Sequence, residues 1–404
     1  MGKKIRLIYR NKDFLFLLSS ELISTFGDVF FYTAISWLAF SVTNSTFSVS
    51  LLNIADLIPT LLFVMVISIF IDRSNQQRKI MMSIYFIQGI ITAALCILVV
   101  LGYLNIWMVF IFIFLNSAAA SGKNPLINKI LVHINHGELA EMNTLLTTGK
   151  RIISVIGSLL AGFCANYISF IVFIDFMTFI LSFILISRIN YGEMTSENEE
   201  TSVLQDTKEI KNYLKTNKNL TWFLLLSFSV STASLSVMIA FPSISENILK
   251  MGSEGYGLLN SVANFSGMII LLLFPVIDKL TKRLEVLIIL LGVFTIAFGL
   301  STHIIFVLIC LMLFEIISAL MDVSLPTILQ TIISEQMIGR MFGIITILSI
   351  VSSMIGQFVF GYLIDHFNTS FILTIAGIYC ILVAFIIKHN MDRFPKLKEK
   401  AIVD

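Results

Sequence analysis

Charged side chains are scarce in this 404-residue sequence. Asp, Glu, Lys and Arg make up 13% of it, whereas a soluble domain carries about 25%. Hydrophobic residues make up 57%, and the mean hydropathy is +0.93. So little charge cannot cover a surface that faces water, which excludes a chain built only of soluble domains. The net charge of +2 gives no reason to expect a nucleic acid as partner.

Paired cysteines and catalytic motifs are also missing. The four cysteines stand singly in apolar stretches, without CxxC or CxH spacing, which argues against disulfides and zinc sites. The sequence has no GxxxxGK[ST] loop for ATP, no zincin motif and no GxSxG elbow. We therefore expect no enzyme activity, no cofactor and no metal. Energy would then come from an ion gradient or from the gradient of the substrate itself.

Long apolar runs dominate the sequence. A helix needs about 20 apolar residues to cross the hydrocarbon core of a bilayer. Such runs lie near residues 14–40, 47–71, 80–102, 105–127, 142–164, 167–187, 220–244, 256–277, 284–302, 304–332, 341–364 and 369–387. They predict an all-α membrane protein with twelve transmembrane helices in two pseudo-symmetric six-helix bundles. We place the bundles at 1–190 and 219–390, joined by a cytoplasmic linker, 191–218, and followed by a tail, 391–404.

The distribution of basic residues supports an even number of spans. With the N-terminus inside, nearly all of the 27 Lys and Arg residues fall in cytoplasmic segments, as the positive-inside rule requires. Lys250 lies outside, and Lys123, Lys150 and Arg151 lie within spans. We expect a plasma-membrane protein, of bacterial origin, with both termini in the cytoplasm.

Ionisable residues inside the spans are the candidate functional groups, because burying charge in a membrane is costly and usually serves function. The carboxylates are Glu21, Asp28, Asp56, Asp175, Glu315 and Asp322, and the cations are Lys123, Lys150 and Arg151. Ion pairs that only lock helices together are the alternative reading. Asp175, flanked by Ile174 and Phe176, is expected to pack against or cap a helix.

Spacing and depth divide these residues by role. Glu21 and Asp28 are seven residues apart, two helical turns, and therefore share a face; Glu315 and Asp322 repeat this spacing. We predict these four as proton-coupling groups, with Asp28 and Glu315 nearer the midplane. Glu21 is expected to face a charge network of Lys123, Lys150 or Arg151. Lys123, Asn116 and Asp56 are predicted to bind substrate, since a cavity lysine suits a carboxylate or phosphate.

Several motifs support a family resemblance. Span 2 ends with Asp72-Arg73-Ser-Asn-Gln-Gln-Arg78-Lys79, and span 8 ends with a degenerate copy around Asp278. Span 5 contains Gly157-Ser158-Leu-Leu-Ala161-Gly162, and Gly339-Arg340 precedes span 11. In this order the motifs resemble the major facilitator superfamily, in its macrolide-efflux-type branch of drug–proton antiporters. Departures from that pattern include Ser158, which replaces a proline, and Asn116, which stands where many antiporters have an arginine.

The resemblance implies a monomeric secondary transporter that exports a drug-like or metabolite substrate in exchange for protons. It also implies that Asp72, Arg73, Arg78, Asp278, Gly339 and Arg340 take part in conformational gating. Small residues in span 5 would permit close helix contact. An importer or a flippase for a lipid-like substrate on the same fold stays open as an alternative. A membrane enzyme is less favoured, because the acidic residues lie deep in the helices.

Overall fold

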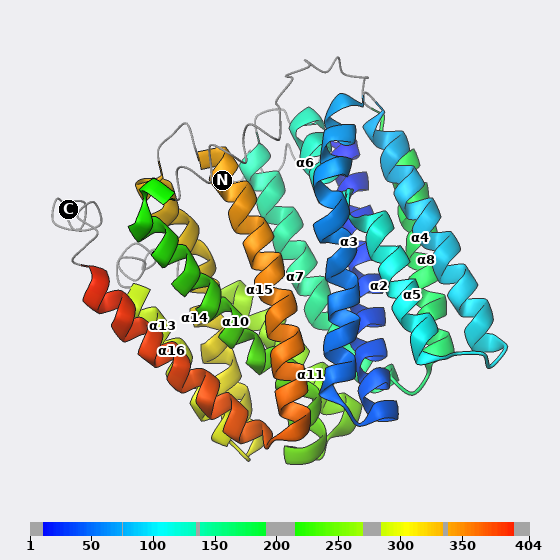
Figure 1. The fold of residues 1–404 in the computed structure, drawn as a ribbon. Coiled ribbons are helices and arrows are strands. Elements are labelled where there is room, and N and C mark those ends of the chain that lie inside the picture. The colour runs from blue at the N-terminus through cyan, green and yellow to red at the C-terminus, as the bar shows by residue number, and fades with distance from the viewer. Residues whose placement is uncertain are drawn as a thin grey trace. The chain divides into compact units, whose positions relative to one another are not determined.

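A computed structural model describes residues 11–74, 76–134, 138–190, 215–269, 284–333 and 338–391. All regular structure in this part of the chain is helical (Figure 1). The helices of the first half are α2 (Lys12–Thr43), α3 (Thr46–Arg73), α4 (Gln77–Val100), α5 (Ile106–Ala120), α6 (Lys123–Ile134), α7 (Leu139–Cys164) and α8 (Ile168–Ser187). Those of the second half are α10 (Lys218–Ser243), the π-helical turn η1 (Ile244–Ile248), α11 (Gly252–Ile269), α13 (Leu284–Leu300), α14 (Ile304–Ile332), α15 (Ile338–His366) and α16 (Thr369–Met391).

The described helices match the predicted spans in number and order. Ten helical segments are long and apolar enough to cross a membrane, and one of these, Ile106–Ile134, combines α5 and α6. The two other spans correspond to α13, which is apolar but only 17 residues long, and to α11, which has 18 residues. The protein is therefore an all-α membrane protein of twelve transmembrane helices.

The fourth span differs from the single run that the sequence predicted. It breaks at Ser121 and Gly122, where α5 ends and α6 begins. Pro125 explains the break, because it has no N–H to donate and its ring clashes with the carbonyl four residues earlier, at Ser121. Proline is tolerated in the first turn of a helix, which is its place in α6. As a result, Lys123 becomes the first residue of a new helix instead of a mid-helix side chain.

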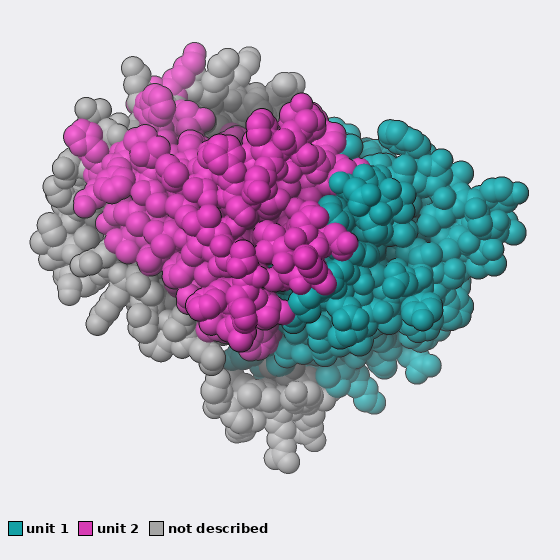
Figure 2. Space-filling model, turned by 90° about the horizontal axis from the view of Figure 1, so that it is seen from below, with its two compact units in different colours: residues 1–44, 51–199, 251–264 teal, residues 45–50, 200–250, 265–404 magenta. Residues whose placement is uncertain are grey.

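The chain divides into two compact units (Figure 2). Unit 1 consists of residues 1–44, 51–199 and 251–264, and unit 2 of residues 45–50, 200–250 and 265–404. Each unit thus includes a short segment from the other half of the sequence. Most of the predicted linker, 191–214, and nearly all of the tail, 392–404, lie outside the described residues, so the predicted domain limits stay a prediction.

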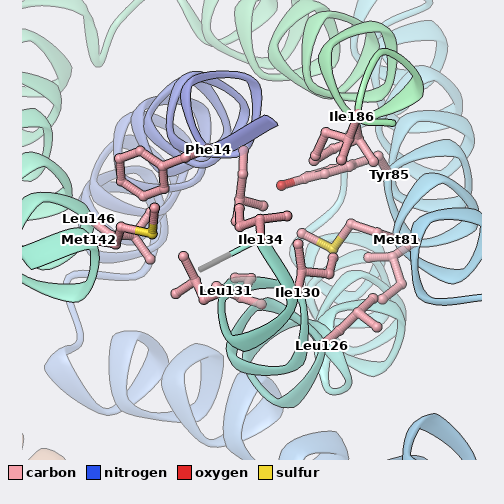
Figure 3. Close-up of a cluster of buried hydrophobic side chains, with 14 of the residues drawn as sticks. Phe14, Met81, Tyr85, Leu126, Ile130, Leu131, Ile134, Met142, Leu146 and Ile186 are labelled. Atoms are coloured by element: carbon pink, nitrogen blue, oxygen red, sulfur yellow. The ribbon is translucent and has the colours of Figure 1, made fainter. Parts of the chain in front are cut away.

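Helix α2 is central to unit 1, because α7 and α8 both pack along it and α8 also packs against α4. One apolar cluster of unit 1 includes Phe14, Met81 and Tyr85 together with side chains of α6, α7 and α8 (Figure 3). A second cluster contains Phe30 and Ile35, further along α2. The polar face of α2 lies between these clusters and is the part that positions the candidate site.

Unit 2 is held together by close helix contacts. Gly292 of α13 and Gly377 of α16 face each other, and a Cβ on either would lie 2.5 Å from the carbonyl oxygen of the other. Helix α10 packs against both α15 and α16. Glycines at such a crossing let the two backbones approach closely. Within lipid the hydrophobic effect does not drive helices together, so this close van der Waals packing stabilises their contact.

Candidate functional site

Glu21 is the centre of an ion-pair cluster inside unit 1. Its side chain is 0% exposed. Lys150 Nζ, from α7, lies 2.6 Å from Glu21 Oε2, and the Tyr85 hydroxyl, from α4, donates a 2.6 Å hydrogen bond to Glu21 Oε1. Both carboxylate oxygens therefore have a partner, which offsets much of the cost of burying the charge. The sequence predicted Lys123, Lys150 or Arg151 opposite Glu21 but gave no indication of Tyr85.

Lys123 is shared between two carboxylates. Its Nζ donates a 2.8 Å hydrogen bond to Ser24 Oγ and lies 3.8 Å from Asp28 Oδ2 and 3.9 Å from Glu21 Oε1. The same nitrogen lies 5.0 Å from the centre of the Tyr85 ring, in cation–π range. A lysine at the start of α6 opposes the helix dipole. The two acids of α2 therefore hold this cation where the helix alone would disfavour it.

A polar cavity of about 300 Å³ lies beside this cluster, within unit 1. Its walls come from α2 to α7 and include both cations and two of the carboxylates. The residues lining it are Thr25, Asp28, Tyr32, Asp56, Thr60, Gln88, Asn116, Ser117, Ala120, Ser121, Lys123, Asn124 and Lys150. In the described part of the chain, no group of His, Cys, Asp and Glu is arranged to hold a metal ion. The chemistry available here is charge pairing and hydrogen bonding.

Asp56 forms another part of the cavity wall. The Tyr32 hydroxyl donates a 2.7 Å hydrogen bond to Asp56 Oδ1, and Ser117 Oγ donates a 2.5 Å bond to the backbone oxygen of Asp56. No cation among the described residues forms an ion pair with Asp56, so the donors to this residue are hydroxyl groups. The sequence indicated Asp56 as a site residue but not Tyr32, because a single tyrosine in an apolar helix does not distinguish a site residue from an ordinary one.

Two amide side chains pair in the same cavity. Gln88 Nε2, from α4, donates a 2.9 Å hydrogen bond to Asn116 Oδ1, from α5. Both side chains are buried, and Gln88 Oε1 has no hydrogen-bond partner among the described residues. The sequence predicted Asn116 to bind substrate, and the structure places it on the cavity. Gln88 was not predicted, although a polar amide near the middle of an apolar span could have identified it as a candidate site residue.

Of two further charged residues, Arg151 differs from expectation and Asp175 agrees with it. Arg151, next to Lys150 on α7, is half-buried and forms no ion pair within the described part of the chain. Asp175 of α8 is 1% exposed and packs against α2, as predicted, but its carboxyl group caps no helix among the described residues. Lys150 therefore joins the cluster without its neighbour.

The acids of the second half lie on α14, in unit 2. Glu315 is half-buried, whereas Asp322 is exposed and lines a cavity of about 150 Å³. Ser227, Ser231 and Ser349 line the same cavity. The repeated seven-residue spacing therefore leads to different surroundings. In unit 1 the acids belong to a charge cluster, and in unit 2 Asp322 lines a smaller, mostly apolar cavity with a few serines.

The predicted gating residues are only partly described. Asp72 and Arg73 lie in the last turn of α3 and Gly339 and Arg340 in the first turn of α15, without a description of their side chains. Asp278 lies outside the described residues. Arg78 Nη1 donates a 2.7 Å hydrogen bond to the carbonyl oxygen of Ile189, just beyond the end of α8. This bond links the start of α4 to the segment that follows α8.

Helices α7 and α11 meet through small residues, within unit 1. A Cβ on Gly257 would lie 2.7 Å from both the Cα of Gly162 and the carbonyl oxygen of Ser158. The hydroxyls of Ser158 and Ser261 lie 3.0 Å apart. The span-5 motif therefore permits close helix contact, even though Ser158 stands where the resembled signature has a proline.

Comparison with known proteins agrees with this fold. A search of curated proteins found no significant match. Among solved structures, the nucleoside transporter NupG is similar at a TM-score of 0.78 and 11% identity, covering 93% of this chain and 98% of the other. The auto-inhibited POT family peptide transporter reaches 0.72 at 11% identity, covering 94% and 97%. A bacterial homolog of the human lysosomal transporter Spinster, inward-facing and occupied, reaches 0.73 at 12% identity, covering 96% and 98%.

These identities are too low to show more than a shared fold. A family model provides the assignment, since it matches residues 17–349. That match spans most of the described helices, and it agrees with the solved transporters in pointing to transport instead of enzyme activity. The chain belongs to the Major Facilitator Superfamily.

Proposed function

We propose that this transporter exchanges a small-molecule substrate for protons and exports it, with Asp28 as the principal proton-carrying group. The position of Lys123 is the observation that supports this proposal. One ammonium group lies within 4 Å of two carboxylates, Asp28 and Glu21, at the wall of a polar cavity. Because Glu21 also has Lys150 and Tyr85 as partners, Asp28 is the one of these two carboxylates that can more easily take up a proton.

Proton uptake would change the charge of the cavity wall. With Asp28 ionised, the carboxylate holds Lys123 close to α2. With Asp28 protonated, Lys123 keeps only Glu21 as an ionic partner and can attract a carboxylate or phosphate of the substrate. The proton and the substrate then favour different states of the same site. Such differential binding is what alternating access requires of two coupled ligands.

The substrate class follows from both charge signs in the cavity. Lys123 suits an acidic group, Asp56 suits a basic group, and the amides of Gln88 and Asn116 suit neutral polar groups. A drug-like or metabolite substrate of the macrolide, siderophore or peptide-antibiotic type fits this mixture. Export, a cell-membrane location, cytoplasmic termini, a bacterial source and a monomeric state rest on the sequence motifs and the distribution of basic residues.

An efflux assay with a panel of substrates tests the proposal. Cells expressing wild type, Asp28→Asn or Glu254→Gln are loaded with a macrolide, a siderophore or a peptide antibiotic, with and without a proton uncoupler. Glu254 is an exposed carboxylate outside the site, which makes it a matched control. We expect efflux that the uncoupler stops, that Asp28→Asn loses and that Glu254→Gln retains. Efflux insensitive to the uncoupler would contradict proton coupling, and full efflux by Asp28→Asn would exclude Asp28.

A further inference from the structure

Asp175 is a buried carboxyl group that the coupling scheme above does not use. It lies on α8, is 1% exposed, and its Oδ1 atom is buried with no hydrogen-bond partner among the described residues. The nearby hydroxyl of Thr178 is already committed, because it donates a 2.7 Å hydrogen bond to the backbone oxygen of Asp175. A hydroxyl has one proton to donate, so Thr178 cannot also satisfy the carboxylate.

The carboxyl of Asp175 lies against α2 beside the coupling site. A Cβ on Gly27 would lie 2.7 Å from Asp175 Oδ1 and would overlap Thr178 Oγ1. Gly27 directly precedes Asp28, which lines the polar cavity. The absence of a side chain at Gly27 therefore lets Asp175 approach the backbone of α2 next to the proposed proton-carrying group.

The charges of the cluster do not balance without protons. Its carboxylates are Glu21, Asp28, Asp56 and Asp175, and its cations are Lys123 and Lys150. Lys150 is paired with Glu21, and Lys123 is shared between Glu21 and Asp28. Neither cation lies within ion-pair distance of Asp175. An unpaired carboxylate inside a membrane protein is costly enough that the group takes up a proton instead.

We propose that Asp175 is a second proton-binding site of unit 1, next to Asp28, and that it is a neutral acid in the conformation described here. A proton on Asp175 removes the one negative charge of the cluster that neither Lys123 nor Lys150 contacts, and it leaves the ion pair of Lys123 with Asp28 intact. This proposal rests on the proposed function only for the role of Asp28; the proton on Asp175 follows from burial and missing partners. The titratable groups that interact electrostatically with Asp175 are Asp28 and Tyr32 on α2 and Lys123 on α6.

Infrared spectroscopy tests the proposal without a substrate. Purified wild type at neutral pH should show the stretching band of a protonated carboxyl group, shifted in D2O, and Asp175→Asn should lose intensity there. Ser182→Ala is the control, because Ser182 lies on the same face of α8 and binds the backbone oxygen of Ser20 without a carboxyl group. The control should keep the band. Equal intensity in wild type and Asp175→Asn would overturn the proposal.

A second measurement needs only wild-type protein, in case Asp175→Asn does not fold. Dicyclohexylcarbodiimide adds to protonated carboxyl groups in apolar surroundings, and mass spectrometry locates the adduct. An apolar groove of α2, α7 and α8, with Phe26, Met177 and Thr178 among its lining residues, offers the reagent a route toward Asp175. We expect an adduct on Asp175; modification confined to other carboxyl groups would overturn the proposal. Either result is independent of whether efflux depends on protons.

Discussion

Lys150 and Glu21 form an ion pair of 2.6 Å in which the glutamate is completely buried and the lysine is partly exposed. The pair joins α7 to α2, the central helix of unit 1. Because Glu21 also accepts a hydrogen bond from Tyr85, three helices meet at one carboxylate. This arrangement fixes the position of Lys150 on the wall of the cavity that Lys123 and Asp28 also line.

Removing one partner of this pair should destabilise the protein. Lys150→Met leaves Glu21 buried without its closest cation, which costs on the order of 3–5 kcal/mol in soluble proteins. The double variant Glu21→Gln, Lys150→Met removes both charges and should regain much of that loss. Thermal unfolding of the purified protein in detergent checks this. A double variant no more stable than Lys150→Met would show that the two residues are not coupled.

Lys123→Met should remove transport while leaving the protein inserted. The methionine keeps an unbranched side chain of nearly the same length but cannot pair with Asp28, so we expect a loss on the order of tenfold or more. Lys388→Met, at an exposed position in the last turn of α16, is the control and should transport normally. Efflux of the substrate found by the panel, normalised to protein in the membrane, is the measurement. Normal efflux by Lys123→Met would remove Lys123 from the site.

A side chain at Gly257 should separate α7 from α11. Gly257→Val places methyl groups where the backbone of Gly162 already lies within 3 Å of a Cβ, and overpacking of this kind costs about 1–3 kcal/mol. Gly343→Ala is the control, because a Cβ there meets nothing within 4 Å. Thermal unfolding should show a lower midpoint for Gly257→Val only. An unchanged midpoint would mean that the close contact adds no stability.

Asp365 should stabilise the start of α3, within unit 2. Its carboxylate accepts hydrogen bonds from the backbone N–H of Thr46 at 2.6 Å and of Phe47 at 3.1 Å, and from the hydroxyls of Ser45 and Thr46. It thus satisfies N–H groups that a helix start leaves open. Asp365→Ala should cost about 1 kcal/mol, and Asp365→Asn, which retains an acceptor, should cost less. Equal unfolding midpoints for Asp365→Ala and wild type would contradict this role.

The sequence predicted the helices well because lipid leaves few alternatives. Long apolar runs must form helices there, since no water can satisfy the backbone, and the described helices overlap all twelve runs. The break between α5 and α6 was not predicted, although Pro125 was visible. Pro125 breaks the span only if a new helix begins just before it, and the position of that helix start depends on tertiary packing.

The charged part of the site was also visible, but its neutral part was not. Glu21, Asp28, Asp56 and Lys123 stand out because charge in an apolar run is rare. Tyr32, Tyr85 and Gln88 do not stand out, since single neutral polar residues are common in such helices. The small residue at Gly27 and its contact with Asp175 depend on how α2 and α8 cross, which spacing along one helix cannot show.

Cysteine accessibility tests the central claim, that water reaches the charged wall of the unit 1 cavity. The native cysteines Cys96, Cys164, Cys310 and Cys380 are first replaced by alanine. Single cysteines are then introduced by Ser121→Cys on the cavity wall and by Ile111→Cys, at a largely exposed position of α5 that lipid should cover. A membrane-impermeant thiosulfonate reagent, applied from each side of the membrane, should modify Ser121→Cys and leave Ile111→Cys unmodified. If Ser121→Cys is unreactive from both sides, the cavity is dry and the account is contradicted.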